Sequence, residues 1–288
     1  MNYDNKKIIV SVSGGKDSTA MCLNLLEQGY STSDFVRVFA DTGWESKETY
    51  RYLDELEKTI GKIHRVKAQI PIREEHKQIV QELEDELGFE SNMIRYAIRN
   101  QTFPSRNRKW CTTKLKIEPM KKFFDEIDDD FVNLVGIRKE ESPKRSKMTK
   151  WEYSDYFDCW VHRPLMDWTE KDVIDIHHRF NLIPNRLYLN GSNRVGCYPC
   201  IYSRKSEIKN IPIERIKFIS KLERTFTKLR NDRKGDDVVL TFFTPRVKGT
   251  TLTIEDVFEW SQTVRGGVQF ELFDTEEPTC IKWGMCGV

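Results

Sequence analysis

The chain has 288 residues, of which 38% are hydrophobic and 32% are charged, and its net charge is +2. This composition can fill one large domain, or a core with a smaller appendage. No stretch approaches the roughly 18 apolar residues that span a bilayer, and the first residues lack the apolar core of a signal peptide. These features exclude a membrane protein and favour a cytoplasmic one.

Strand and helix patterns alternate through the first half of the chain. We expect strands at 6–12, 34–43, 62–69 and 131–138, because each is a short apolar run ending in a turn or a polar residue. Amphipathic patterns predict helices at 17–29, 46–61 and 167–181, with Thr169 as the N-cap of the last. Residues 71–122 look mostly helical but show little core periodicity.

Alternating strands and helices predict a parallel sheet with right-handed crossovers. Ligands bind such sheets beyond the carboxyl ends of the strands. Ser13–Ser18, Asp41–Gly43 and Gly136–Arg138 all follow predicted strands, so we expect them to share one crevice. From about residue 206 the pattern changes to a long basic helix at 214–234, an extended stretch at 238–245 and a helix at 252–264.

The segment SVSGGKDS, residues 11–18, joins the first strand to the first helix. Gly14 and Gly15 allow the backbone to approach an oxyanion, and the amides at the helix start form an anion site. Lys16 adds a point charge, and Ser13 and Ser18 add hydroxyl donors. The spacing differs from that of a Walker A loop, but the physics of phosphate binding is the same.

SGGKDS resembles the loop of the PP-loop ATP pyrophosphatases, which split ATP between the α and β phosphates. VFADTGWESKETY and LVGIRKEESPKR resemble two segments of the phosphoadenosine phosphosulfate (PAPS) reductase family, and RKWCTTKLKIEP is similar to its cysteine-lysine segment. RPLMDWTEKDVIDI and LIPNRLYLNGSNRVGCYPC complete the family's order of motifs. The chain is therefore identified as a member of this family over about residues 7–205.

The resemblance implies an adenine nucleotide alpha hydrolase-like, Rossmann-like α/β fold. It consists of a five-stranded parallel sheet in a nucleotide-binding domain at 1–205, followed by a mainly helical extension at 206–288. It also implies a nucleotide site for ATP or a PAPS-like nucleotide, with Mg²⁺ held near Asp17. The implied nucleotide-binding residues are Ser11, Ser13, Gly14, Gly15, Lys16, Asp17, Ser18, Asp41, Thr42, Gly136, Arg138, Ser142 and Arg145.

Seven cysteines are many for a cytoplasmic chain, where disulfides are rare. Cys22 and Cys159 fit core positions. Cys197 and Cys200 form a C-x2-C pair, which zinc, redox and iron–sulfur sites all use. Cys111 lies in the family's cysteine segment. The family match favours a [4Fe-4S] cluster held by Cys111, Cys197, Cys200 and Cys286 over structural zinc.

Two departures from the family pattern leave alternatives open. Related cluster-bearing reductases have two adjacent cysteines where this chain has Cys111 and Thr112, so a C-terminal ligand is needed for four thiolates. The chain ends Cys-Gly-Val, without the histidine that follows the attacking cysteine in those reductases. Either Cys286 is the fourth ligand and Cys280 the catalytic thiol, as we favour, or the two roles are exchanged.

The complete loop, with Lys16 and Asp17 as catalytic residues, predicts that ATP is cut. The expected function is an iron–sulfur sulfurtransferase acting on a nucleic acid, DNA or tRNA, or on a nucleotide. Its sulfur donor would be a cysteine desulfurase, and Cys280 or an open iron site would carry the sulfur. Among similar proteins homodimers are common.

A nucleic acid would bind the basic stretch 95–122, which has nine Lys and Arg residues and one acid. Tyr96, Phe103 and Trp110 are interleaved there for base stacking. Nucleotide binding alone, or a solvated surface, would explain the same charges.

Other functions remain open. The first alternative is a PAPS or adenylyl-sulfate reductase that uses a thioredoxin-like reductant, with Cys286 as nucleophile. The second is a non-catalytic nucleotide- or redox-sensing module that binds nucleic acid. The ATP sulfurylase small subunit shares the SGGKDS loop but lacks the cysteine set, so it ranks last. Pyrophosphate release from ATP distinguishes the expected sulfurtransferase from the reductase.

Overall fold

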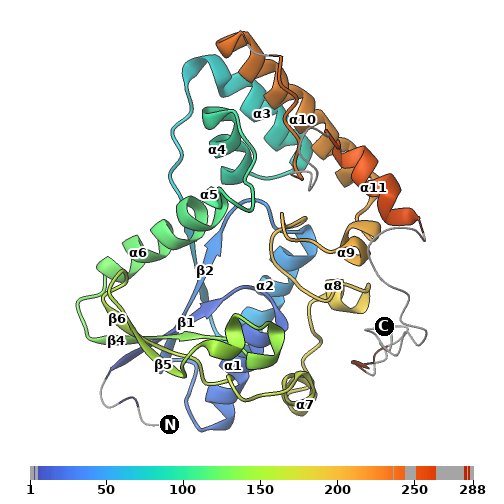
Figure 1. Ribbon diagram of the computed structural model, residues 1–288. Helices are drawn as coiled ribbons and strands as arrows, with labels where there is room; N and C mark the ends of the chain where they lie inside the picture. Colours follow the sequence, from blue (N-terminus) through green and yellow to red (C-terminus); the bar gives the residue numbers. More distant parts are fainter. Residues whose placement is uncertain are drawn as a thin grey trace.

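The computed structural model describes residue 3 and residues 6–235, 237–243, 251–263, 282, 283 and 285. Its sheet has six strands in the order β3-β2-β1-β4-β6-β5 (Figure 1). All neighbours are parallel except β5, which runs antiparallel to β6 at one edge. The strands are β1 Lys7–Val12, β2 Phe35–Asp41, β3 Ile63–Lys67, β4 Phe131–Val135, β5 Trp151–Ser154 and β6 Cys159–His162.

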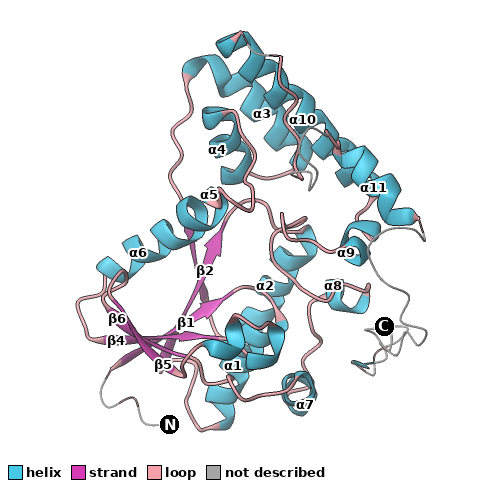
Figure 2. Cartoon of the chain, viewed as in Figure 1, coloured by secondary structure: helices cyan, strands magenta, loops and turns pink. Residues whose placement is uncertain are grey.

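Eleven α-helices are assigned in the described residues, and they cover the sheet and build a second lobe (Figure 2). The helices up to residue 125 are α1 Lys16–Glu27, α2 Lys47–Ile60, α3 Lys77–Leu87, α4 Asn92–Asn100, α5 Trp110–Thr112 and α6 Glu118–Asp125. The later ones are α7 Glu170–Arg179, α8 Arg186–Leu189, α9 Lys205–Lys209, α10 Ile213–Lys234 and α11 Ile254–Gln262. Short turns of 3-10 helix lie at Glu74–His76, Lys139–Glu141 and Arg145–Lys147, and a π-helix at Thr113–Ile117.

The two faces of the sheet are covered by different helices, as the alternation of side chains along a strand requires. Ile8, Val10 and Val12 of β1 face a core shared with α1, α2 and α7. Ile9, between them, belongs to a smaller core with Met120 and Phe124 of α6. The predicted α/β class is confirmed, and Thr169 caps α7 as expected; Ser46 caps α2.

The prediction of a five-stranded parallel sheet is wrong in one respect. A hairpin, β5–β6, completes the sheet, and its outer strand β5 is antiparallel. The hairpin was not predicted from the sequence, because each of its strands has only four residues. Its sequence also places Trp151, Tyr153 and Trp160 on the exposed side, so no run of buried apolar residues marks it.

Residues 71–122 also differ from expectation, because they contribute to a second hydrophobic core. Val80 and Leu83 of α3 and Ile94 and Ile98 of α4 pack with buried side chains of α10 and α11. In Figure 1 these four helices form the upper lobe, above the sheet. The core lies on both sides of the boundary predicted at residue 205. Residues 238–243, part of the predicted extended stretch, are assigned to neither a helix nor a strand.

No helix among the described residues is long and apolar enough to cross a membrane.

A buried carboxyl group connects three segments of the upper lobe, which α3, α4, α10 and α11 form. Glu223 of α10 is 4% exposed, and it accepts hydrogen bonds from the backbone N–H groups of Phe242 at 2.7 Å and Ile254 at 3.0 Å. Burial raises the pKa of Glu223 to about 7, although the two amides oppose the shift.

We expect Glu223→Gln to flatten the pH dependence of stability. The folded-state pKa lies above the ordinary value, so the protonated group stabilises the fold fully below about pH 4.5, and this contribution is lost as the pH rises through 7. Between pH 5 and 8 the wild type should lose stability, by an amount on the order of 2 kcal/mol, relative to the variant. Urea unfolding at both pH values measures it. Glu214→Gln in the first turn of α10 is the control, and parallel pH profiles for wild type and Glu223→Gln would contradict the assignment.

Candidate functional site

The loop between β1 and α1 is built around a glycine with a left-handed backbone. Gly14 has φ +71°, and a Cβ there would lie 2.9 Å from the Thr49 methyl group. Gly15 is the N-cap of α1, and the N–H of Lys16 donates to the Tyr188 hydroxyl at 3.0 Å. The loop therefore needs glycine at position 14, and Tyr188 holds the first amide of the helix.

Two serine hydroxyls fix the shape of this loop. Ser18 Oγ accepts the Ser13 N–H at 3.1 Å and donates to the Gly15 carbonyl at 3.0 Å. Ser13 Oγ lies 3.1 Å from Ser18 Oγ. Ser11 is on β1, where its hydroxyl donates to Asn133 Oδ1 at 2.8 Å, so its contact is with the neighbouring strand β4.

The end of β4 meets the start of α1 backbone to backbone. A Cβ at Gly136 would lie 2.8 Å from the Asp17 carbonyl oxygen, so a larger residue would push the two segments apart. Two residues later, Arg138 is 3% exposed and its guanidinium binds the Asp17 carboxylate. This contact joins two of the segments predicted to share one crevice.

A cavity of about 550 Å³ opens at this point. Most residues predicted to bind a nucleotide line it, together with residues from the 139–145 turns and from 188–204. The lining consists of Ser13, Gly15, Lys16, Asp17, Ser18, Gly136, Arg138, Glu140, Glu141, Ser142, Arg145, Glu170, Tyr188, Asn193, Arg194, Val195 and Arg204.

Carboxylates pair with three cations of this cavity. The pairs are Lys16 with Glu170, Arg138 with Asp17 and Glu140, and Arg145 with Glu141. Burial raises the pKa of Asp17, although the charge of Arg138 opposes the shift. Burial also acts to raise the pKa of Glu170, but the hydrogen bond and charge of Lys16 outweigh it and the pKa is lowered. Glu170 is therefore held as an anion beside the lysine.

Glu170 has a second cationic neighbour. Lys282 Nζ lies 3.5 Å from its other oxygen, and the adjacent Trp283 is 2% exposed and packs against Tyr188 and His177. Residues 282 and 283 thus contact the same helix and the same tyrosine that position Lys16.

Asp41 and Thr42 lie away from the cavity lining. Asp41 accepts from the Tyr50 hydroxyl at 2.7 Å and from the Gly43 N–H at 2.9 Å. The Thr42 hydroxyl donates to Glu45 at 2.8 Å. This network leads toward the cysteines, since Glu45 forms a β-bridge with Cys197.

Three of the predicted ligand cysteines gather at this bridge. The Cys197 thiol lies 4.0 Å from Glu45 Oε1, and Lys116 Nζ lies 3.9 Å from the same oxygen. Burial raises the pKa of Cys197 to about 12, and the charge of Lys116 opposes the shift. Burial likewise raises the pKa of Cys111, to which Cys200 also contributes.

The described residues contain no preformed group of three or more His, Cys, Asp or Glu side chains able to hold a metal ion. Cys111, Cys197 and Cys200 are free thiols at the margin of the second core. Cys280 and Cys286 lie outside the described residues. Cys22 and Cys159 are buried, as predicted for core cysteines.

The structure removes Phe103 from the stacking surface predicted over 95–122, whereas Tyr96 and Trp110 remain partly exposed. Phe103 is buried between Phe226 and Phe242, with ring centroids 4.7 and 5.6 Å away. Tyr96 and Trp110 pack on each other at 4.5 Å. Phe103 belongs to the second hydrophobic core, so its ring is not accessible for stacking on a base.

Several cavity residues were not singled out from the sequence. Glu170, Tyr188 and Arg194 lie inside segments whose resemblance to the family was noted, but only their contacts reveal their place. Arg204 lies four residues beyond the end of the second of these segments. The family motifs marked these segments of the sequence, but they did not indicate which residue would line the cavity.

Comparisons with known proteins find a family model that covers most of the chain. The profile of the phosphoadenosine phosphosulfate reductase domain matches residues 7–203. An uncharacterized 37.8 kDa protein of Escherichia phage 186 is 32% identical, over 92% of this chain and 90% of that protein. The adenosine 5'-phosphosulfate reductase of a Geobacillus species is 27% identical, over 57% of this chain and 60% of that enzyme.

Two solved structures are also similar. The phosphoadenylyl-sulfate reductase of Candida auris, in a phosphate complex, has a TM-score of 0.48 and 14% identity, over 68% of this chain and 84% of that one. The U34-tRNA thiolase NcsA of Methanococcus maripaludis, with its [4Fe-4S] cluster, has a TM-score of 0.37 and 16% identity, over 77% and 72% of the two chains.

Removing the charge of Glu170 should free Lys16 for a phosphate. We expect Glu170→Gln to bind ATP about fivefold more tightly in the absence of metal, because the carboxylate no longer competes for the ammonium group. Calorimetric titration with ATP in a chelating buffer measures the affinity. The control is Asp175→Asn, which removes an exposed partner of Lys171 on the same helix. Unchanged or weaker binding by Glu170→Gln would show that Glu170 does not compete with the nucleotide.

Proposed function

The chain belongs to the phosphoadenosine phosphosulfate reductase domain family, and on that basis we propose that it cleaves ATP to release pyrophosphate and transfers sulfur with an iron–sulfur cluster. The nucleotide binds the cavity at the carboxyl ends of β1 and β4. The acceptor of sulfur is a nucleic acid, DNA or tRNA, or a nucleotide. A cysteine desulfurase is a suitable sulfur donor.

The ion pairs in the cavity are the observation that supports ATP as the nucleotide. Lys16, Arg138 and Arg145 each contact a carboxylate, so a metal-free sulfonucleotide would bring its negative charges against those carboxylates. A polyphosphate that arrives with a divalent cation brings a partner for them instead. The cavity's own charges therefore favour Mg-ATP over a metal-free anion.

The oxygen donors of the cavity fit Mg²⁺. Proteins usually hold this ion through one or two carboxylates and the phosphates of the substrate, without a complete cage of protein ligands. Asp17 is the carboxylate in the first turn of α1, and we assign it to the ion. When bound, Mg²⁺ supplies charge neutralisation on the leaving pyrophosphate.

The chain's own residues orient and stabilise the reacting phosphates. Gly14 lets the loop turn tightly, and the start of α1 presents its dipole to the phosphate. Lys16 leaves Glu170 to contact the transferring group and offset its charge. Arg138 and Arg145 hold the remaining phosphate oxygens, where their planar guanidinium groups suit bidentate contacts.

For the sulfur half, we assign Cys111, Cys197 and Cys200 to a [4Fe-4S] cluster. Cys200 contributes to the raised pKa of Cys111, and both contribute to the raised pKa of Cys197, so the three thiols lie near one another; thiolates are the ligands that such clusters use. Lys116 beside Cys197 would balance the charge of a thiolate. The fourth ligand is Cys286, with Cys280 as the thiol that carries sulfur, or the reverse.

The main alternative is sulfonucleotide reduction with a thioredoxin-like reductant, the activity named for the Geobacillus relative. In that reading the loop binds the nucleotide and no pyrophosphate is released. The division into a nucleotide-binding domain at 1–205 and a C-terminal extension at 206–288 applies to either function. A homodimer is also compatible with both.

We expect anaerobically purified protein to release pyrophosphate from Mg-ATP, and to do so faster with DNA or tRNA. Lys16→Ala should lower the rate by roughly 100-fold, because it removes a charge that acts on the transition state. An enzyme-coupled pyrophosphate assay measures the rate, and Lys171→Ala, an exposed lysine of α7, is the control. Absence of pyrophosphate in every condition, together with reduction of PAPS, would replace this proposal with the reductase.

Cys197→Ser should abolish the visible absorbance of the cluster and most of the roughly four iron atoms expected per chain. Iron analysis and absorption spectra of anaerobic protein measure both. Cys159→Ser, at a buried cysteine of β6, should keep its iron. Stoichiometric zinc with no visible absorbance in the wild type would show a structural zinc site instead.

A further inference from the structure

The β5–β6 hairpin exposes an unusual amount of aromatic surface. Trp151, Tyr153, Tyr156 and Trp160 are 44%, 45%, 52% and 43% exposed. All four lie within the ten residues 151–160, at one edge of the sheet. Clustered exposed aromatic side chains of this kind mark interaction surfaces more often than solvated ones.

The register of the hairpin puts three of these rings on one face. Tyr153 pairs with Trp160, and Trp151 pairs with His162. The Tyr153 and Trp160 rings meet edge to face with centroids 5.5 Å apart, and Trp151 stacks on the buried His162 at 3.9 Å. The rings are thus braced by their neighbours while part of each remains open to solvent.

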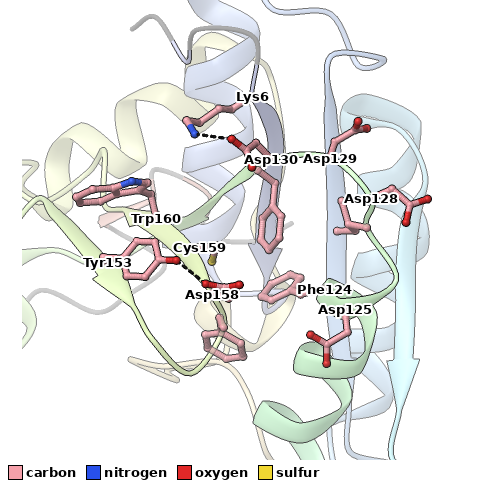
Figure 3. Close-up of a pocket in the computed structure, with 13 residues that line it drawn as sticks. Lys6, Phe124, Asp125, Asp128, Asp129, Asp130, Tyr153, Asp158, Cys159 and Trp160 are labelled. Atoms are coloured by element: carbon pink, nitrogen blue, oxygen red, sulfur yellow. Dashed lines mark hydrogen bonds and ion pairs between the residues drawn. The ribbon is translucent and has the colours of Figure 1, made fainter.

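A cavity of about 500 Å³ lies beside this face and joins the hairpin to the start of β4. Figure 3 shows Tyr153, Trp160 and Asp158 on one side of it and Asp125, Asp128, Asp129 and Asp130 on the other. The carboxylates are Asp125, Asp128, Asp129, Asp130 and Asp158, and Lys6 is the one cation among the lining residues.

These carboxylates are mostly solvated; Asp125 forms a close ion pair with Lys121 on the same helix, whereas the ion pairs of Asp129 and Asp130 are longer. Asp130 lies 3.4 Å from Lys6 and Asp129 lies 3.7 Å from Lys7, with side-chain exposures of 89% and 74%. Asp158 accepts the Tyr153 hydroxyl, which links the acidic side of the cavity to the aromatic side. The surface therefore combines negative charge with exposed ring faces.

The outer side of β5 has no neighbouring strand among the described residues. An edge strand presents backbone N–H and C=O groups to which an extended segment of another chain can add. Lys6 and Asp130 precede β1 and β4, so this cavity is at the amino ends of the strands. The nucleotide cavity is at their carboxyl ends, and the two can be occupied together.

We propose that the hairpin and its acidic cavity form a docking surface for an extended, lysine- or arginine-bearing segment of a partner protein. Carboxylates and aromatic faces together select a cation: the former by charge, the latter through cation–π contacts. A nucleic acid is disfavoured because five aspartates would repel its phosphates. The partner adds at the outer side of β5 and continues over the hairpin face, where its basic side chains lie between Trp160 and the aspartates.

The test uses the full-length protein and a fluorescent peptide of alternating lysine and valine. We expect binding that weakens as salt is added. Trp160→Ala and Asp128→Lys should each weaken it at least about fivefold. Asp128 is exposed, so the charge reversal leaves the fold intact even if the tryptophan variant is unstable. Neither variant should change pyrophosphate release.

Matched controls separate this surface from general charge. Trp260→Ala removes an exposed tryptophan of α11, and Glu82→Lys reverses a charge on α3. Neither should alter peptide binding, and a peptide of alternating glutamate and valine should not bind. The proposal is overturned if the controls lose as much affinity as Trp160→Ala, or if the lysine peptide does not bind.

Two other ligands of this surface, a second copy of the chain and a nucleic acid, would give different experimental results. A dimer of the wild type that Trp160→Ala dissociates in light-scattering measurements would mean that a second copy covers the hairpin. Binding of a single-stranded oligonucleotide that Trp160→Ala abolishes would mean that bases stack on the rings. Either result would overturn the assignment to a basic protein segment.

Discussion

The close approach of two backbones at Gly136 sets the geometry of the nucleotide cavity. Only a residue without a Cβ lets the chain after β4 pass the Asp17 carbonyl at this distance. That approach brings Arg138 onto the Asp17 carboxylate and delivers the 139–145 turns to the cavity rim. A side chain at position 136 would separate β4 from α1, and with them the cations that face the loop. The phosphate site therefore depends on a backbone contact before it depends on any charged group.

The cysteine group is tied to the same sheet through the end of β2. Asp41 ends that strand and Thr42 follows it, and Glu45 forms the bridge with Cys197. Trp44 next to it donates its indole N–H to the Pro199 carbonyl at 3.0 Å and packs into the second core. The segment from 41 to 45 thus connects the strand ends, the cysteines and the helical lobe. Movement at the cysteines has a direct route to the sheet, although the nucleotide cavity lies at a different pair of strands.

Much of the sheet and the phosphate loop could be predicted, because both depend on local sequence. Buried parallel strands read as apolar runs, and the loop needs glycines and a lysine at fixed spacing. The hairpin β5–β6 could not, since its strands are short and its aromatic side chains Trp151, Tyr153 and Trp160 are exposed. Glu170 looked like an ordinary residue in the first turn of a helix, and only the fold brings it to Lys16. The role given to Phe103 failed for a similar reason: the sequence shows an aromatic among basic residues but not the helices that bury it.

The two cavities, at opposite ends of one sheet, differ in the balance of cations and carboxylates that line them. The nucleotide cavity is lined by five cations, Lys16, Arg138, Arg145, Arg194 and Arg204, against four carboxylates, so it is nearly neutral before a ligand arrives. The cavity beside the hairpin has five carboxylates against Lys6. Strands of about six residues separate the two by about 20 Å, which exceeds the screening length of roughly 8 Å at physiological salt. An anionic nucleotide at one end and a cationic partner at the other would therefore bind with little electrostatic influence on each other, and any coupling between them must pass through the packing of the strands.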